Sequence, residues 1–97
     1  MIKYLENETL EEMLTEDVTI VDFYADWCGP CRMLGMILEE LEDVKVIKIN
    51  VDKNPDLARK FKVMSIPHLC FYKNKELKYE QIGFMSKDDI LKKIEDL

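Results

Sequence analysis

The sequence predicts an α/β fold in which a central mixed sheet of five strands is flanked by four helices. Residues 18–24 and 44–51 are rich in β-branched and aromatic side chains, a composition typical of strands covered on both faces. Between them, apolar side chains recur at the spacing of an amphipathic helix: Met33, Leu34, Ile37, Leu38 and Leu41. Two strands joined by a helix form a βαβ unit, so we expect parallel neighbours with a right-handed crossover.

The segment before this unit is expected to hold a short strand and one helix. The strand covers residues 2–5. Asn7 is placed to cap the helix through its side chain. Three apolar residues at helical spacing give the helix its buried stripe: Leu10, Met13 and Leu14.

The segment after the unit is expected to hold a short helix and a hairpin. Asn54 is expected to cap the helix, and Pro55 suits its first turn. Residues 68–72 and 77–82 are expected to pair as antiparallel strands, with Asn74 taking positive φ in the turn.

A last helix is expected to close the chain. Gly83 ends the hairpin, where freedom in φ is useful. Ser86 resembles the first residue of a capping box. Four apolar residues are expected to form the buried face of this helix: Ile90, Leu91, Ile94 and Leu97.

Length and composition favour one domain, residues 1–97, and exclude several classes of function. Fourteen Lys and Arg stand against twenty Asp and Glu, a net charge of −6 that argues against nucleic acid as a partner. No apolar run is long enough to span a bilayer, and the N-terminus lacks the apolar segment of a secretory signal. We therefore expect a cytoplasmic monomer without a membrane partner. Its three cysteines, an odd number, do not fit the disulfide framework of a small secreted domain.

The motif Cys28-Gly29-Pro30-Cys31 lies between the first buried strand and the helix, and its spacing fits redox or metal chemistry. A helix start stabilises a thiolate, which favours Cys28 as the nucleophile and Cys31 as the resolving cysteine. Gly29 leaves the attacking sulfur uncrowded, and Pro30 fits the first turn of the helix. Trp27 offers an apolar contact surface beside the motif, or is a plain core aromatic.

Two charged residues interrupt the buried strands. Asp22 needs a partner or a proton there, and it is placed to accept the proton of the resolving cysteine. The alternative is a structural, hydrogen-bonded aspartate. Lys48 comes towards Asp22 if the two strands pair in parallel, or it extends to solvent from a strand end.

The dipeptide Ile66-Pro67 precedes the first hairpin strand. It forms either an ordinary turn or a cis peptide bond beside the site. The residues alone leave both open.

The chain resembles the thioredoxin family along essentially its whole length. The matching segments are 21–31 (VDFYADWCGPC), 48–52 (KINVD), Asn54-Pro55, Ile66-Pro67 and Gly83. C-x-x-C alone is a weak signal. The combination of Trp-Cys-Gly-Pro-Cys, an aspartate six residues before the first cysteine and a later Ile-Pro is specific. The resemblance implies a thioredoxin fold.

It also implies a reductase of protein disulfides that holds no bound cofactor. Electrons would come from NADPH through a thioredoxin reductase. In the family, the aspartate matching Asp22 is buried and assists proton transfer to and from the cysteine matching Cys31. The lysine matching Lys48 lies near that aspartate.

Substrate contacts are implied in the same way. The proline matching Pro67 is cis and faces the cysteine pair, and the backbone of the residue matching Ile66 hydrogen-bonds the substrate chain. Gly83 matches a glycine of the apolar docking surface.

The chain departs from the family pattern at several positions. Tyr24 stands where many members have Trp, and Arg32 stands where Lys is usual. Met36 replaces a helix-kinking proline, which removes the sequence signal for a kink. Lys75 occupies the place of a turn glycine, and His68 replaces the common Thr after the proline.

Three other interpretations compete with the reductase. A zinc site could be assembled from four residues: Cys28, Cys31, His68 and Cys70. The simpler account of Cys70 is a buried strand residue, and the thioredoxin interpretation expects no metal. A non-catalytic binding module with this fold is the second rival. A glutaredoxin-like use of glutathione is the third, and the Gly-Pro between the cysteines speaks against it.

Overall fold

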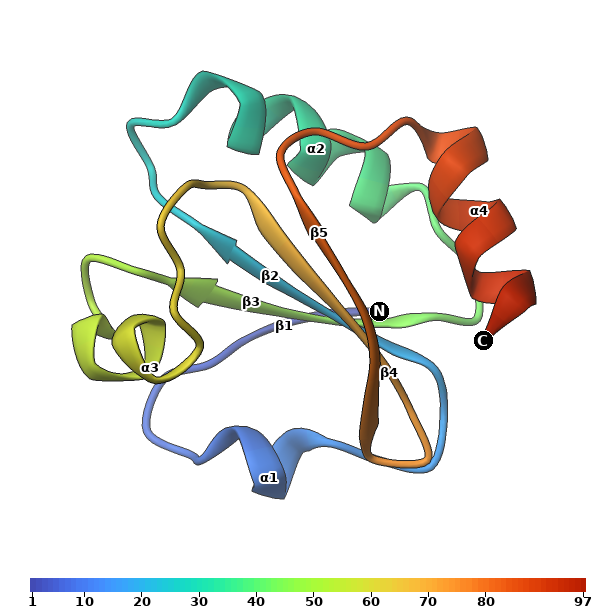
Figure 1. The fold of residues 1–97 in the computed structure, drawn as a ribbon, viewed down its shortest axis with the longest axis horizontal. Coiled ribbons are helices and arrows are strands. Elements are labelled where there is room, and N and C mark those ends of the chain that lie inside the picture. Colours follow the sequence, from blue (N-terminus) through green and yellow to red (C-terminus); the bar gives the residue numbers. More distant parts are fainter.

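The structure is a computed structural model that describes residues 1–97, and it contains one five-stranded sheet and four helices (Figure 1). In chain order the elements are β1 (Ile2–Tyr4), α1 (Leu10–Met13), β2 (Thr19–Tyr24), α2 (Gly29–Glu39), β3 (Lys45–Asn50), α3 (Pro55–Lys60), β4 (His68–Lys73), β5 (Glu76–Ile82) and α4 (Lys87–Asp96). The predicted α/β layout is confirmed. No helix is both long and apolar enough to cross a bilayer.

The sheet is mixed, and β2 lies at its centre. The strand order is β1-β3-β2-β4-β5. β3 pairs in parallel with both β1 and β2, whereas β4 is antiparallel to β2 and to β5. The predicted parallel pairing of β2 with β3 through α2 is therefore confirmed. It places the start of α2 at the carboxyl end of the central strand.

Helices cover both faces of the sheet. Figure 1 shows α2 and α4 on one face and α1 and α3 on the other. Val21 and Phe23 belong to the core under α1 and α3, and Ile20 belongs to the core under α2 and α4. Side chains alternate between the faces of a strand, so Asp22 shares the α2 face with Ile20.

The cap of α1 differs from the prediction. Thr9, not Asn7, is the N-cap, and its Oγ1 accepts a hydrogen bond from Glu12 N at 3.2 Å. The preceding residues form a separate turn in which Glu6 N donates to the Glu8 carboxylate at 2.6 Å. Asn7 therefore lies two residues before the N-cap and does not bond to the free N–H groups of the first helical turn.

Asn54 is the N-cap of α3, but its side chain makes no capping hydrogen bond. Its Nδ2 donates instead to the backbone oxygen of Asn50 at 3.0 Å. This bond holds the helix start against the end of β3.

The buried stripes of the two longer helices are narrower than predicted. In α2, Leu34 and Leu38 are buried, whereas Met33 is 55% exposed. In α4, Ile90 is buried, whereas Leu91 is 41% exposed. Neighbouring helical residues point about 100° apart, so only one of each adjacent pair reaches the sheet.

The hairpin turn matches its prediction and adds one irregularity. Asn74 has positive φ, as predicted, and so does Lys75 (φ 66°), which gives two left-handed residues in a two-residue loop. A β-bulge lies between Phe71 and Tyr72, so Cys70 pairs with Glu80. Beyond the hairpin, Gly83 has φ 94°.

The predicted cap of α4 is confirmed. Ser86 is the N-cap, and its Oγ accepts a hydrogen bond from Asp89 N at 3.1 Å. The helix then runs from Lys87 to Asp96 across the α2 face of the sheet (Figure 1).

Candidate active site

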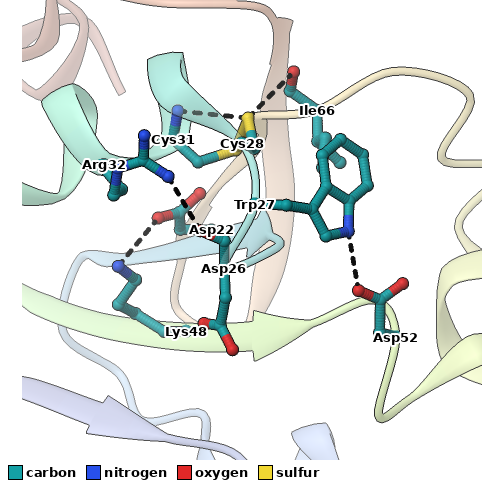
Figure 2. The surroundings of a disulfide bond; sticks show 9 residues. All are labelled: Asp22, Asp26, Trp27, Cys28, Cys31, Arg32, Lys48, Asp52 and Ile66. Carbon is teal, nitrogen blue, oxygen red and sulfur yellow. Dashed lines mark hydrogen bonds and ion pairs between the residues drawn. A yellow bond between two sulfur atoms is a disulfide. The ribbon is translucent and has the colours of Figure 1, made fainter.

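The two motif cysteines are joined by a disulfide at the start of α2 (Figure 2). Cys28 is the N-cap residue, and its sulfur accepts a hydrogen bond from Cys31 N at 3.2 Å. Pro30 lies in the first turn, as predicted. The backbone N–H groups of a helix start stabilise negative charge, so a reduced Cys28 would be favoured as the thiolate. We therefore expect the Cys28 sulfur to act as a nucleophile when the disulfide is reduced.

Asp22 is fully buried on the α2 face of β2, and neither of its carboxylate oxygens has a hydrogen-bond partner. Burial raises the pKa of Asp22 to about 6, against the opposing effect of the Lys48 ammonium. A carboxyl group that titrates near neutral pH can both accept and return a proton under ordinary conditions. No protein group lies within hydrogen-bond distance of the carboxylate, so the alternative of a structural aspartate has no protein donor to support it.

Lys48 is the charged partner of Asp22. The two residues pair in the β2–β3 register, and Lys48 Nζ lies 3.8 Å from Asp22 Oδ2 (Figure 2). The prediction that parallel pairing brings them together is confirmed. Lys48 is only 9% exposed, and its ammonium lies 4.4 Å from the centre of the Tyr24 ring. The alternative of a solvent-directed lysine is wrong.

Gly35 makes room for this ammonium, and the sequence analysis missed it. A Cβ atom at Gly35 would lie 3.2 Å from Lys48 Nζ, closer than ordinary van der Waals contact. A glycine inside a helix costs up to about 1 kcal/mol relative to alanine. Its presence in the middle of a predicted helix was the available signal that something approaches the backbone there.

A depression of about 220 Å³ lies beside the ion pair, and its walls include Cys31, Arg32 and Lys48. Cys31 and Lys48 therefore border one open space. Water in this space would connect the buried end of the disulfide with the charged pair.

Trp27 lies on the surface next to Cys28. Its side chain is 69% exposed, and Nε1 donates a hydrogen bond to Asp52 Oδ2 at 2.9 Å (Figure 2). The alternative of a core aromatic is therefore wrong. Asp52 was part of the matching segment 48–52, yet its contact with the indole was not predicted because the two loops meet only in three dimensions.

The Ile66-Pro67 peptide bond is cis, which decides between the two alternatives left by the sequence. The Ile66 carbonyl oxygen lies 3.9 Å from Cys28 Sγ (Figure 2). Gly83 N donates to the Pro67 oxygen at 2.8 Å. Ile66 therefore lies at the disulfide, and the predicted contact residues Pro67 and Gly83 are joined to it by the peptide bond and by this hydrogen bond. Gly29 and Pro30 border the disulfide from the helix side, and Pro30 is exposed.

The four-residue zinc site is not assembled. Cys28 and Cys31 form the disulfide, whereas His68 and Cys70 lie together with Glu80. Cys70 is fully buried in the core under α1 and α3, as its simpler account predicted. Burial, with the Glu80 carboxylate, raises the pKa of Cys70 to about 12, so this thiol is not a second nucleophile.

Known proteins are similar to this chain over nearly its whole length, well beyond the cysteine motif. Residues 1–96 match the family model described as Thioredoxin. A thioredoxin of Listeria monocytogenes serovar 1/2a is 38% identical over 95 residues, 93% of this chain and 92% of the relative. A thioredoxin of Rickettsia typhi is 43% identical over 90 residues, 88% of this chain and 83% of the relative.

Solved structures agree with the sequence comparison. A mutant thioredoxin from Halobacterium salinarum NRC-1 superposes with a TM-score of 0.87 at 37% identity, covering 98% of this chain and 88% of the other. The fold, the cysteine pair at the helix start and the relatives therefore lead to one assignment. This chain belongs to the thioredoxin family of protein-disulfide oxidoreductases.

Proposed function

We propose that this chain reduces disulfides of client proteins, with Cys28 as the nucleophile and Cys31 as the resolving cysteine. The observation that carries the proposal is the Cys28–Cys31 disulfide at a helix start, beside the buried pair Asp22–Lys48. A non-catalytic binding module would need none of these groups in this arrangement.

The exchange takes place in two displacements. The Cys28 thiolate attacks one sulfur of the client disulfide, and the other client sulfur leaves as a thiolate and takes up a proton. Cys31 then loses its proton and attacks Cys28 Sγ, which releases the second client sulfur as a thiolate that takes up a proton from solvent. The client gains two electrons and two protons, and Cys28–Cys31 becomes the disulfide.

Asp22 is proposed as the group that takes the Cys31 proton. Its pKa of about 6 suits an acceptor working near neutral pH, and Cys31 and Lys48 border the same open space. The transfer would pass through water. Lys48 is proposed to hold the ionised carboxylate once the proton has left for solvent.

The client chain is proposed to lie across the surface around Cys28. The contact residues are Trp27, Gly29, Pro30, Ile66, Pro67 and Gly83. The Ile66 carbonyl lies 3.9 Å from the attacking sulfur, which supports its proposed role as a hydrogen-bond acceptor for the client backbone. An extended peptide bound in this way would present its disulfide to Cys28.

Recharging is proposed to come from a thioredoxin reductase that draws electrons from NADPH, with no cofactor held by this chain. The proposal includes a cytoplasmic monomer, because reducing conditions keep a dithiol available for the next client.

The test is reduction of insulin disulfides coupled to NADPH oxidation, with a panel of thioredoxin reductases. The wild-type chain is expected to turn over. Cys28→Ser should abolish turnover, whereas Cys31→Ser should accumulate a mixed disulfide with insulin that mass spectrometry detects. Full activity of Cys28→Ser would show that the mechanism is wrong. Binding of insulin by the wild-type chain without any reduction would favour the non-catalytic module.

A further inference from the structure

Three side chains that can bind metals lie together on the sheet, away from the cysteine pair. They are His68 and Cys70 on β4 and Glu80 on β5. One possible ligand atom from each residue lies within 4.8 Å of the other two. His68 Nε2 is 2.7 Å from Glu80 Oε2, and Cys70 Sγ is 3.9 Å from the same oxygen.

The strand geometry holds these donors on one face. His68 and Cys70 are two residues apart and so point to the same side of β4. The β-bulge between Phe71 and Tyr72 shifts the hairpin register and places Glu80 directly opposite Cys70. Directly opposed residues share a face and bring their side chains close together. The three donors therefore do not depend on a flexible loop.

Two of the three side chains are buried, and the third, Glu80, is partly exposed. His68 is 4% exposed and Cys70 is fully buried, so two donors are fixed by the surrounding packing. Nδ1 of His68 is also buried, and this ring nitrogen has no hydrogen-bond partner. The Glu80 side chain is 43% exposed on the edge strand and can swing, which provides an entry path for an ion.

We propose that His68, Cys70 and Glu80 form a binding site for one Zn²⁺ ion, separate from the Cys28–Cys31 disulfide. Imidazole, thiolate and carboxylate are the protein ligands that zinc takes, and three of them leave a fourth position for water. The thiolate disfavours the hard ions Mg²⁺ and Ca²⁺. The proposal does not depend on the reductase activity.

A tetrahedral site requires all three donor-to-donor distances to adjust from their present values, which are within 4.8 Å. Zinc bonds of about 2.3 Å to sulfur and about 2.0–2.1 Å to nitrogen or oxygen place donor atoms roughly 3.4 to 3.6 Å apart. The His68–Glu80 distance of 2.7 Å must open, and the Cys70–Glu80 distance of 3.9 Å must close slightly. Rotation of the half-exposed Glu80 side chain changes both of these distances, whereas the distance between the His68 and Cys70 donors closes by a shift of those two side chains.

The proton balance follows from the hydrogen bonds that the ion replaces. Zinc bonds to a thiolate, so the Cys70 proton is released to solvent. The imidazole binds through its Nε2 in the neutral form, which places its remaining proton on Nδ1. Glu80 binds as the carboxylate. One Zn²⁺ therefore binds with the release of one proton from this cluster and without any change of oxidation state.

The test uses the oxidised protein, because its disulfide removes Cys28 and Cys31 as competing thiolate ligands. Zn²⁺ is measured by equilibrium dialysis and elemental analysis, and Co²⁺ serves as the spectroscopic probe. The expected result is one ion per chain, with a thiolate-to-cobalt charge-transfer band in the near ultraviolet. Zn²⁺ should remove that band by displacement.

Three variants identify the ligands. Cys70→Ser should abolish the charge-transfer band, and His68→Thr and Glu80→Gln should each weaken Zn²⁺ binding by about tenfold or more, the effect seen even for outer-shell changes. Glu76→Gln is the matched control, since it removes an exposed carboxylate from the same strand, and it should bind zinc like the wild type. Circular dichroism of each variant establishes that it is folded.

Two results would overturn the site. One is the absence of saturable Zn²⁺ and Co²⁺ binding by the folded, oxidised wild-type chain. The other is one-to-one binding that His68→Thr and Cys70→Ser leave unchanged, which would place the ion on surface carboxylates.

Discussion

Replacing Asp22 with asparagine should make the protein more stable at neutral pH. The pKa of Asp22 rises from 3.8 to about 6, chiefly because burial disfavours the charged carboxylate. Each unit of pKa corresponds to about 1.4 kcal/mol, so ionised Asp22 opposes folding by about 3 kcal/mol above both values. Asparagine has the same shape and never takes up this charge. Asp22→Asn should therefore gain about 3 kcal/mol at pH 7.

The sign of the pH dependence follows from proton uptake. Between about pH 3.8 and 6, the folded chain holds a proton on Asp22 that the unfolded chain has lost. Stability therefore falls as pH rises through this window, and it stays lowered above it. At pH 4 the unfolded chain is only partly ionised, so the gain from Asp22→Asn should be much smaller than at pH 7.

The assay is urea unfolding of the oxidised proteins at pH 4 and pH 7, followed by circular dichroism. Asp26→Asn is the matched control, because Asp26 is an exposed carboxylate in the same stretch. Its effect should stay within about 0.5 kcal/mol at both pH values. A gain for Asp22→Asn that is equal at the two pH values, or a loss of stability at pH 7, would refute the reasoning.

Three further substitutions test the packing, the helix cap and the ion pair. Leu34→Ala should cost about 2–5 kcal/mol in urea unfolding because Leu34 is fully buried, whereas exposed Met33→Ala should change stability by at most about 0.5 kcal/mol; equal losses would contradict the assigned stripe of α2. Ser86→Ala should cost about 1 kcal/mol by removing the N-cap of α4, and Ser86→Asn should retain most of it. Lys48→Met should raise the pKa of Asp22 above about 6, because the ammonium now lowers it. A carboxyl-carbon NMR titration of Asp22 that is the same in both proteins would show that Lys48 has no such effect.

The central part of the site was predictable because its residues break local patterns. A lone carboxylate inside an apolar strand indicates either a partner or a raised pKa, and Asp22 has both. Lys48 interrupts the neighbouring strand in the same way, and parallel pairing fixed their meeting. Such conflicts between burial and charge are visible in one dimension.

The ends and faces of the helices were less predictable. Asn7 and Thr9 are both good capping residues, so the start of α1 was decided by which turn brings Leu10 into the core. Met33 and Leu91 are apolar, yet each lies next to a buried residue and points away from the sheet into solvent. Periodicity gives the direction of a stripe but not its width, which depends on the packed neighbour.

Glu80 could not have been placed from the sequence. A regular hairpin with a turn at Asn74 and Lys75 would set Tyr79 opposite Cys70, with Glu80 facing the other side. The bulge adds one residue to β5 and turns Glu80 towards Cys70. No glycine or proline in β5 indicates a bulge at this position.

The order of the strands also bears on solubility and on tolerance to change. The two outer strands are β1, which has three residues, and β5, whose exposed residues include the alternating charges Glu76, Lys78 and Glu80. A short strand and a charged strand are both poor templates for a second molecule to pair with. The charges on β5 that disfavour such pairing are thus separated by β4 from Asp22 on the central strand β2. Neutral β-branched residues along β5 would be expected to promote fibre formation while leaving the disulfide intact.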